Sequence, residues 1–345
     1  MIDEYRDRQL FNKTFSHVYV EKEAFEYDLT KEVIGKFKNS SVIEIECYKS
    51  VFNKSRQNII LQKKSQSLIL AVKHGNFVYK GAPFCQSFGN ENFYYTSLLM
   101  GCIYDCEYCY LTGMYPSADI VLFVNIEDFF REIENTLADN STAYYCISYD
   151  TDLLALDGIF NLSGRFIEFC SDKPGLKIEL RTKSSRIPDL SKAKTGNRSN
   201  LCNFIIAFTL SPDSVSHEFE HGAPDLKMRL EAVKNAADAG FPVRLIFDPL
   251  IKIADFERIY GDFFEYVFKE LKGIQIYDAG IGVFRISDSY LSKMYAARPY
   301  SKITAYPYER IDGAASYDIR SHKKMLEFSR EHILMYAPDI KIFAL

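Results

Sequence analysis

The 345-residue sequence contains no tryptophan and no apolar run near the roughly 18 residues that a membrane-spanning helix needs. Its first residues, MIDEYRDRQLFNK, are polar and mixed in charge, without the apolar segment of a signal peptide. These absences predict a cytoplasmic location and no membrane partner. Neither charge dominates, because 42 Lys and Arg face 46 Asp and Glu, which gives a net charge of −4. The overall charge therefore does not identify a nucleic-acid-binding protein, and any basic patch must be local.

Internal repeats, low-complexity segments and long linkers are absent as well. The length suits one large domain or two smaller ones, and the 47% hydrophobic content is enough for a buried core. Eight cysteines in a chain that is neither small nor secreted are poorly explained by disulfides. A clustered subset of them is better explained by metal binding or catalysis.

From about residue 93 onward, short apolar segments alternate with helical ones. We expect helices that include residues 126–138, entered through Asn125 as N-cap, and residues 225–239, ended by Gly240. Such alternation predicts an α/β fold with a parallel sheet, which the pattern leaves open between a doubly wound sheet and a partial barrel. The six strands are expected at residues 93–99, 143–148, 176–181, 203–210, 242–248 and 279–286.

The segment before residue 89 has a more mixed pattern, with strands expected at residues 17–21 and 68–72 and a helix at 27–37. We therefore divide the chain into three parts. These are an N-terminal α+β region (1–88), a βα domain (89–290) and a C-terminal segment that packs on it (291–345).

Three cysteines lie within eight residues directly after the first strand of the βα domain. Cys102, Cys106 and Cys109 have the spacing C-x3-C-x2-C. Three such thiolates can ligate three irons of a [4Fe–4S] cubane, whereas a cluster used only for electron transfer normally takes four cysteines. The fourth iron is then open and can chelate the amino and carboxylate groups of S-adenosylmethionine (SAM).

Two other interpretations of these cysteines remain. Zinc is the main competing metal, but structural zinc sites take four ligands, commonly two C-x2-C pairs, and here one pair has no clear mate. The alternative of three incidental buried thiols requires this spacing to arise by chance. We therefore expect an open iron–sulfur site.

A C-x3-C-x2-C motif after a strand is the signature of the radical SAM superfamily, and further segments narrow the resemblance. Residues 17–37, the CEYCYL sequence around the cluster, Cys146-Ile147-Ser148 and residues 220–243 together resemble the spore photoproduct lyase family. The match runs in patches from about residue 17 to 290. The family's basic, Trp-containing tail is matched poorly by residues 305–320.

This resemblance implies a partial (βα)6 radical SAM barrel with a small N-terminal α+β region. It implies a lyase that uses a [4Fe–4S] cluster, SAM and a flavodoxin- or ferredoxin-type electron donor. The 5′-deoxyadenosyl radical removes a C6 hydrogen from spore photoproduct (5-thyminyl-5,6-dihydrothymine) in UV-damaged DNA. The methylene bridge then cleaves, and a thiol returns a hydrogen atom to the remaining thymine radical.

The resemblance also assigns roles to particular residues. Cys146, near the end of the second strand, is expected to be the hydrogen-atom donor, although a buried packing role is the alternative. Tyr108 and Tyr110 are expected to relay a hydrogen atom, unless they only pack. The expected SAM contacts are the strand-end residues Ser148, Lys183 and Ser211.

The remaining cysteines and histidines are given lesser roles. Cys85 is a second candidate for the donor. Cys47, Cys170 and Cys202 are expected to pack in apolar segments, and the two histidines near strand ends, His217 and His221, to be surface or capping groups.

A DNA substrate requires phosphate contacts around the site. Residues 181–198 hold six Lys or Arg against one Asp, and residues 54–64 add four more without an acid, so either run is a candidate, as is the C-terminal segment. Two other functions stay open. One is a radical SAM enzyme with a non-DNA substrate, and the other is a non-enzymatic iron–sulfur or zinc protein associated with DNA.

Overall fold

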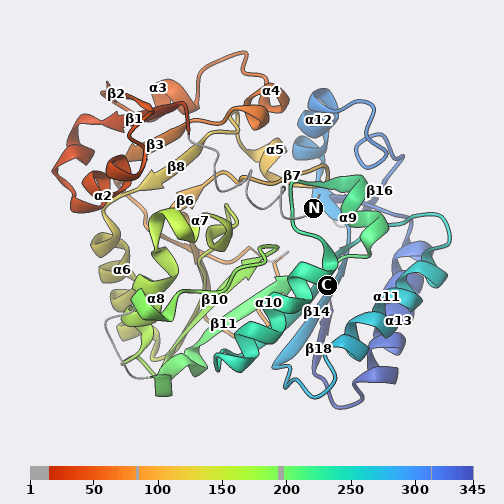
Figure 1. The fold of residues 1–345 in the computed structure, drawn as a ribbon. Coiled ribbons are helices and arrows are strands. Elements are labelled where there is room, and N and C mark those ends of the chain that lie inside the picture. The colour runs from red at the N-terminus through yellow and green to blue at the C-terminus, as the bar shows by residue number, and fades with distance from the viewer. Residues whose placement is uncertain (1–14, 83–84, 193–197, 312, 345) are drawn as a thin grey trace.

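The structure, a computed structural model, describes residues 15–82, 85–192, 198–311 and 313–344. Two sheets organise it, with helices on the outside (Figure 1). The smaller sheet is parallel except for its last strand, β6, which runs antiparallel to β8. Its strands follow the order β2 (Ser41–Ile45), β1 (His17–Glu21), β3 (Leu68–Ala71), β8 (Ile120–Phe123) and β6 (Leu99–Met100).

The N-terminal region supplies three of these strands together with its own short helices. The expected strands at 17–21 and 68–72 and the helix at 27–37 are confirmed, with ends that differ by at most one residue. The helices of this region are α2 (Asp28–Lys36), α3 (Lys49–Phe52) and α4 (Ile59–Lys64), and η1 (Lys22–Glu26) is a 3-10 turn.

The larger sheet has eight strands, of which seven are parallel and the edge strand β4 is antiparallel to β5. The six expected strands are confirmed as β5, β9, β10, β11, β13 and β14, adjacent in chain order, whereas β4 and β18 were not expected. In sheet order the strands are β18 (Ile342–Ala344), β14 (Asp278–Val283), β13 (Val243–Leu250), β11 (Phe204–Thr209), β10 (Leu176–Thr182), β9 (Ala143–Cys146), β5 (Phe93–Thr96) and β4 (Val78–Lys80).

Helices follow the strands and cover one face of this sheet (Figure 1). None of the helices that the structure describes is both long and apolar enough to cross a membrane. Small sheets join β7 (Asp105–Cys106) to β12 (Glu220–His221), and β15 (Arg285–Ser287) to β17 (Ala314–Ser316) and β16 (Glu309–Ile311). The helices are α5 (Leu111–Met114), α6 (Ile126–Asn140), α7 (Leu153–Phe160), α8 (Leu162–Cys170), α9 (Asp213–Phe219), α10 (Leu226–Asp238), α11 (Phe256–Glu270), α12 (Asp288–Ala297) and α13 (Ile319–Tyr336), with 3-10 turns at Leu190–Lys192 and Arg198–Asn203.

Several expected boundaries were wrong for identifiable reasons. The segment 93–99 is two strands, because after Thr96 the chain leaves the larger sheet and enters the smaller one as β6. Strand β9 ends at Cys146, which leaves Ser148 beyond the strand. Asn125 is the N-cap residue of α6, as expected, but its side chain accepts no hydrogen bond from the helix: it pairs instead with both backbone groups of Lys73, at 2.9 and 3.0 Å, and so joins α6 to the end of β3.

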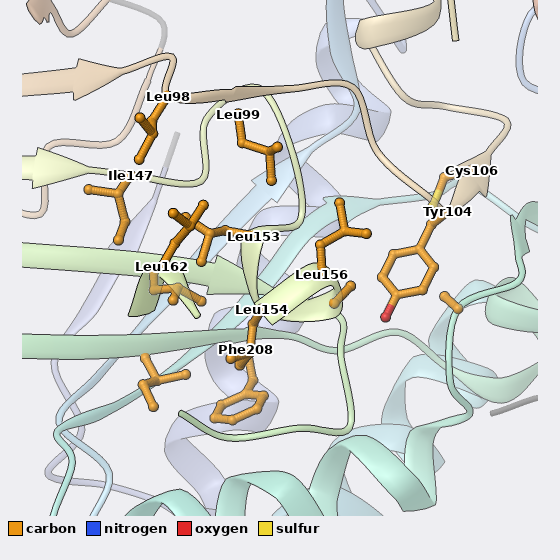
Figure 2. Packing of buried hydrophobic residues seen from close by; sticks show 14 of the residues in the cluster. Leu98, Leu99, Tyr104, Cys106, Ile147, Leu153, Leu154, Leu156, Leu162 and Phe208 are labelled. Carbon is orange, nitrogen blue, oxygen red and sulfur yellow. The ribbon is translucent and has the colours of Figure 1, made fainter. Parts of the chain in front are cut away.

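The two faces of the larger sheet differ in chemistry, as strand alternation requires. One face carries apolar residues such as Ile178, Ile206 and Leu245, which pack against the helices; we call it the helix-covered face. Figure 2 shows part of this core, with the Tyr104 ring directed toward the leucines of α7. The opposite face carries the charged residues Glu179, Arg181, Arg244 and Asp278 and the side chains of Tyr144 and Cys146, together with a small apolar cluster that includes Ile205, Ala207 and Ile246.

The charges on this opposite face are paired in a buried network. The Arg244 side chain is 1% exposed and donates to Glu179 at 2.5 Å, to the Tyr144 hydroxyl at 2.6 Å and to both oxygens of Asp278. Its guanidinium carbon also lies 3.4 Å from the centroid of the Phe88 ring. Buried charges need such partners, because an isolated one is strongly disfavoured.

We therefore expect Arg244→Met to lower the free energy of unfolding by about 3–5 kcal/mol, because it leaves Asp278 buried without its cation and Glu179 with Arg181 alone. Urea denaturation followed by circular dichroism measures this. The matched control is Arg258→Met, since Arg258 is 65% exposed and pairs with Asp255 and Asp262 at the surface of α11. Such exposed pairs contribute about 1 kcal/mol or less. Equal losses in the two variants would contradict the role assigned to the network.

Candidate active site

The three clustered cysteines lie on one loop, between β6 and β8, that we call the cysteine loop (residues 101–119). It begins at Gly101, which has φ of +84° and whose amide donates to the carbonyl of Asp150 at 3.0 Å. A Cβ at this position would lie 2.5 Å from the Asp119 carbonyl oxygen, so only glycine fits there. Residue 101 thus holds together the start and the end of the loop.

The three thiols are close enough to influence one another electrostatically. Burial raises the pKa of Cys102 to about 11, against the lowering effect of the Lys63 ammonium, and burial also raises the pKa of Cys106. Within the described ranges, no three His, Cys, Asp or Glu side chains are arranged to hold one metal ion. Cysteines around a cubane bind separate irons and need not converge on a point.

The N-terminal region holds the outer side of the cysteine loop. Lys63 of α4 donates to the carbonyl oxygens of Cys102 and Tyr104, at 2.5 and 2.7 Å. Gln66 donates to the same Cys102 oxygen at 2.9 Å and to Ala118 at 2.6 Å. Lys63 belongs to the basic run 54–64 that was a candidate for DNA contact, but its ammonium faces the loop instead.

The other side of the loop is held by β12 and α12. Strand β12 pairs antiparallel with β7, placing Glu220 opposite Cys106 and His221 opposite Asp105. His221 contacts Glu107 at 2.9 Å, and Arg298 of α12 forms an ion pair with Asp105. His221 is therefore partly exposed but bound to the loop. His217 lies on α9, and the interactions described for the chain include none between it and a predicted site residue.

Cys146 is the last residue of β9 and lies on the charged face of the larger sheet, beside Glu179 and Arg181. It is 7% exposed, and burial raises the pKa of its thiol to about 12. At neutral pH the group is therefore a thiol that retains its hydrogen. Ser148 is its neighbour: the Arg181 amide donates to the Ser148 hydroxyl at 2.6 Å, and Ser148 also hydrogen-bonds to Cys146.

Tyr110 joins the cysteine loop to this thiol. Its phenol is buried and influenced by both Cys109 and Cys146, and its hydroxyl donates to the carbonyl of Tyr149. Burial, with Asp150 as the largest charge, raises the pKa of Tyr110 well above its usual value, so the phenol keeps its proton. The structure thus brings the expected residues Cys109, Tyr110 and Cys146 into one group.

Cys85, the second donor candidate, contacts Tyr149, which in turn contacts Tyr110. Its sulfur is 3.0 Å from the Tyr149 hydroxyl, and the Tyr149 ring stacks on Tyr95 with centroids 4.2 Å apart. Of the other cysteines, Cys170 is buried as expected, while Cys47 is only partly buried. The expectation for Cys202 was wrong: it is exposed, because its segment is a 3-10 turn before β11.

The remaining expected residues form a second group around Cys106. The hydroxyls of Tyr108 and Ser211 both donate to Glu220, the latter at 2.9 Å, and the Lys183 ammonium lies 5.3 Å from the centroid of the Tyr108 ring. Glu220 is itself paired with Arg229. Sequence reasoning missed Glu220 and Arg229, because nothing local marks them. Only the pairing of β12 with β7 would have placed them at the site.

An α/β sheet that carries a loop with three clustered thiols beside the carboxyl ends of its parallel strands is the arrangement of radical SAM enzymes. More particularly, the chain belongs to the spore photoproduct lyase family, whose family model, described as "Spore photoproduct lyase", matches residues 14–297.

Individual relatives agree with this membership. The spore photoproduct lyase of Bacillus subtilis (strain 168) is 26% identical over 253 residues, which cover 72% of this chain and 71% of the relative. That of Geobacillus sp. (strain Y412MC61) is 22% identical over 268 residues, which cover 76% and 75%.

Two solved structures have the same mixed α/β fold. A cysteine-to-alanine variant of spore photoproduct lyase with dinucleoside spore photoproduct has a TM-score of 0.82 and 20% identity, and the match covers 96% of this chain and 98% of that one. A double variant with bound AdoMet and the same dinucleoside has a TM-score of 0.79 and 21% identity, with 95% and 97% covered.

Proposed function

We propose that the protein is a radical SAM lyase that returns spore photoproduct in UV-damaged DNA to two thymines. The observation that carries the proposal is that the Tyr110 phenol is close enough to feel the charge of both Cys109 of the cysteine loop and the buried Cys146, in a member of this family. We further propose that β5, β9, β10, β11, β13 and β14 form a partial (βα)6 barrel with the charged face inward. The N-terminal region (1–88) and C-terminal segment (291–345) would flank this domain (89–290).

The residues present fit a [4Fe–4S] cluster. Cys102, Cys106 and Cys109 are mutually close, lie on a loop held from both sides, and have no fourth cysteine or histidine among the interactions described for them. These three thiolates would hold the cluster and leave one iron for SAM. When bound, cluster and SAM together supply the 5′-deoxyadenosyl radical that starts the reaction.

The chain's own residues would complete the reaction. Cys146 would return a hydrogen atom to the thymine radical, because an S–H bond is weak and burial keeps this thiol protonated. Tyr110 would relay a hydrogen atom between the thiol and the SAM side.

SAM recognition is assigned to the second group of residues. The Lys183 ammonium would neutralise the methionine carboxylate, and Ser148 and Ser211 would hydrogen-bond the rest of the molecule. Tyr108 supports Lys183 with its ring face, since its hydroxyl is already bound to Glu220. We assign the relay to Tyr110, because its phenol is influenced by both Cys109 and Cys146, and a positioning role to Tyr108.

DNA would be held through phosphate contacts. In the run 54–64, Lys54, Arg56 and Lys64 are exposed and suited to this role. The second run, 181–198, includes residues 193–197, which lie outside the described residues. A flavodoxin- or ferredoxin-type protein in the cytoplasm is our proposed electron donor.

The decisive experiment incubates anaerobically reconstituted, reduced protein with SAM and dinucleotide spore photoproduct, and measures thymine release by chromatography. We expect thymine together with SAM cleavage. SAM cleavage without thymine would favour a different substrate. A protein that binds zinc with no iron absorbance and leaves SAM intact would favour the non-enzymatic alternative.

We expect Tyr110→Phe to slow thymine release about tenfold or more, equivalent to ~1.4 kcal/mol in the barrier, because the variant keeps the ring but has no hydrogen to relay. The same assay measures it. Tyr266→Phe is the control, since Tyr266 is an exposed tyrosine on α11. A Tyr110→Phe rate equal to that of the wild type would remove this tyrosine from the relay.

A further inference from the structure

One carboxylate that was not expected at the site brings together three residues from separate segments. Two of them, Lys183 and Ser211, were expected to contact SAM, and the third, Tyr108, was expected to relay a hydrogen atom. Glu220 is fully buried, with 0% of its side chain exposed. Its Oε1 accepts hydrogen bonds from the Tyr108 hydroxyl and, at 2.9 Å, from the Ser211 hydroxyl. Lys183 also feels the charge of Glu220. The carboxylate thus links the cysteine loop to the ends of β10 and β11.

Arg229 fixes the orientation of this carboxylate. The guanidinium is 1% exposed and donates to Oε2 of Glu220. Its other donors are occupied by the Pro224 carbonyl at 2.8 Å, the Thr209 carbonyl at 3.2 Å and the Ser216 hydroxyl at 3.1 Å. With every partner buried and local, Glu220 has one arrangement, and the backbone pairing of Glu220 with Cys106 ties that arrangement to the cysteine loop.

The hydrogen bonds decide what Tyr108 and Ser211 can offer to a ligand. A hydroxyl has one hydrogen and two lone pairs. Because an ionised carboxylate can only accept hydrogen bonds, both hydroxyls donate their single hydrogen to Glu220. Arg229 donates to Oε2 of the same carboxylate in a fully buried ion pair, which favours the ionised form. Both hydroxyls therefore face any ligand as acceptors.

The charges make the same site suitable for a zwitterion. Lys183 lies among Cys106, Glu220 and Arg229. Glu220 offsets the positive charge of Arg229, so the ammonium of Lys183 stays available for an anionic group. One cation and a pair of fixed acceptors thus lie side by side next to Cys106.

We propose that Glu220 is a positioning residue of the SAM site, which makes Ser211 and Tyr108 acceptors and so selects a hydrogen-bond donor of SAM. The donor is either the amino group of the methionine part, which keeps its N–H bonds when its nitrogen binds iron, or a ribose hydroxyl. This inference rests on the proposed function for SAM as the ligand, but not on the identity of the second substrate.

The test uses reconstituted holoenzyme and the Glu220→Gln variant, which keeps size but replaces one acceptor oxygen by a donor. Affinity is read from the change that SAM causes in the EPR spectrum of the reduced cluster, and iron content and thermal midpoint are recorded for each protein. The probes are SAM, its analogue without the amino group, and its analogue without the ribose hydroxyls. Glu218→Gln is the control, because Glu218 lies two residues earlier, on α9, and is about half exposed at the surface.

We expect Glu220→Gln to weaken SAM binding about tenfold or more, and the control to bind as the wild type does. One analogue should bind the wild type and the variant equally, because it lacks the group that the acceptors recognise. If the variant no longer distinguishes SAM from the analogue without the amino group, the acceptors recognise the amino group of SAM. If it no longer distinguishes SAM from the analogue without ribose hydroxyls, the acceptors recognise those ribose hydroxyls.

Two results overturn the proposal. One is wild-type SAM affinity in iron-loaded Glu220→Gln. The other is an equal loss for SAM and both analogues, which would mean that Glu220 supports only the loop. If Glu220→Gln fails to fold, Ser211→Ala replaces it, because the ion pair stays intact, and unchanged SAM affinity there is equally fatal. The readout is SAM binding, so absence of thymine release by the wild type speaks against the proposed substrate alone.

Discussion

The Cys106→Ala protein will hold no [4Fe–4S] cluster and release no thymine from spore photoproduct. Cys106 is the most buried of the three clustered thiols and the one opposite Glu220 in the β7–β12 pairing, so no neighbouring side chain can replace it. Two thiolates cannot retain a cubane that already leaves one iron open. The measurements are iron content, absorbance of the reconstituted protein near the visible charge-transfer band, and thymine release.

Cys202→Ala is the matched control, because Cys202 is exposed and distant in sequence from the cysteine loop. It should reconstitute like the wild type. A Cys106→Ala protein that retains wild-type iron content and SAM cleavage would refute the three-thiol site, and the radical mechanism would fall with it.

The second large effect is expected for Cys146→Ala. This variant should still cleave SAM and consume the photoproduct, because the cysteine loop and the SAM residues are untouched. The thymine radical will then lack its hydrogen donor and be quenched by other species. We expect the yield of thymine per photoproduct consumed to fall about tenfold or more, with new adducts visible by mass spectrometry.

Cys85→Ala separates the two donor candidates. Its sulfur contacts the Tyr149 hydroxyl rather than lying next to Tyr110, so we expect normal products from this variant. The reverse outcome, clean thymine from Cys146→Ala and adducts from Cys85→Ala, would move the donor role to Cys85.

Much of this fold follows from local patterns. The six central strands were predictable because each is a short, largely apolar segment, and buried parallel strands require that composition. Their order follows from chain order. Local patterns do not show that the chain changes sheets after Thr96, where two successive apolar segments, 93–96 and 99–100, join different sheets. The pairing partner that decides this, β8, lies about twenty residues further along the chain.

The site shows the same limit. The cysteine spacing is local, and so it was readable. Glu220 acts on Tyr108, Ser211 and Lys183 only because three segments meet, and a single acidic residue in a loop carries no sign of that. Lys63 is a similar case, since a lysine in a basic run is indistinguishable in sequence from one that binds two buried carbonyls.

The path of the cysteine loop has a consequence for the reaction. The loop leaves from β6 and returns to β8, so both its ends belong to the smaller sheet. The larger sheet instead carries Cys146 at the end of β9, Lys183 directly after β10 and Ser211 two residues after β11. The three clustered cysteines and the Cys146 thiol are thus carried by different sheets. In the proposed reaction, hydrogen-atom transfer would therefore cross the boundary between the two sheets. Contacts of Tyr110, Glu220 and the Gly101 amide connect the cysteine loop to the larger sheet at this boundary. We therefore expect the rigidity of these contacts, more than that of either sheet, to govern how often the reacting atoms approach one another.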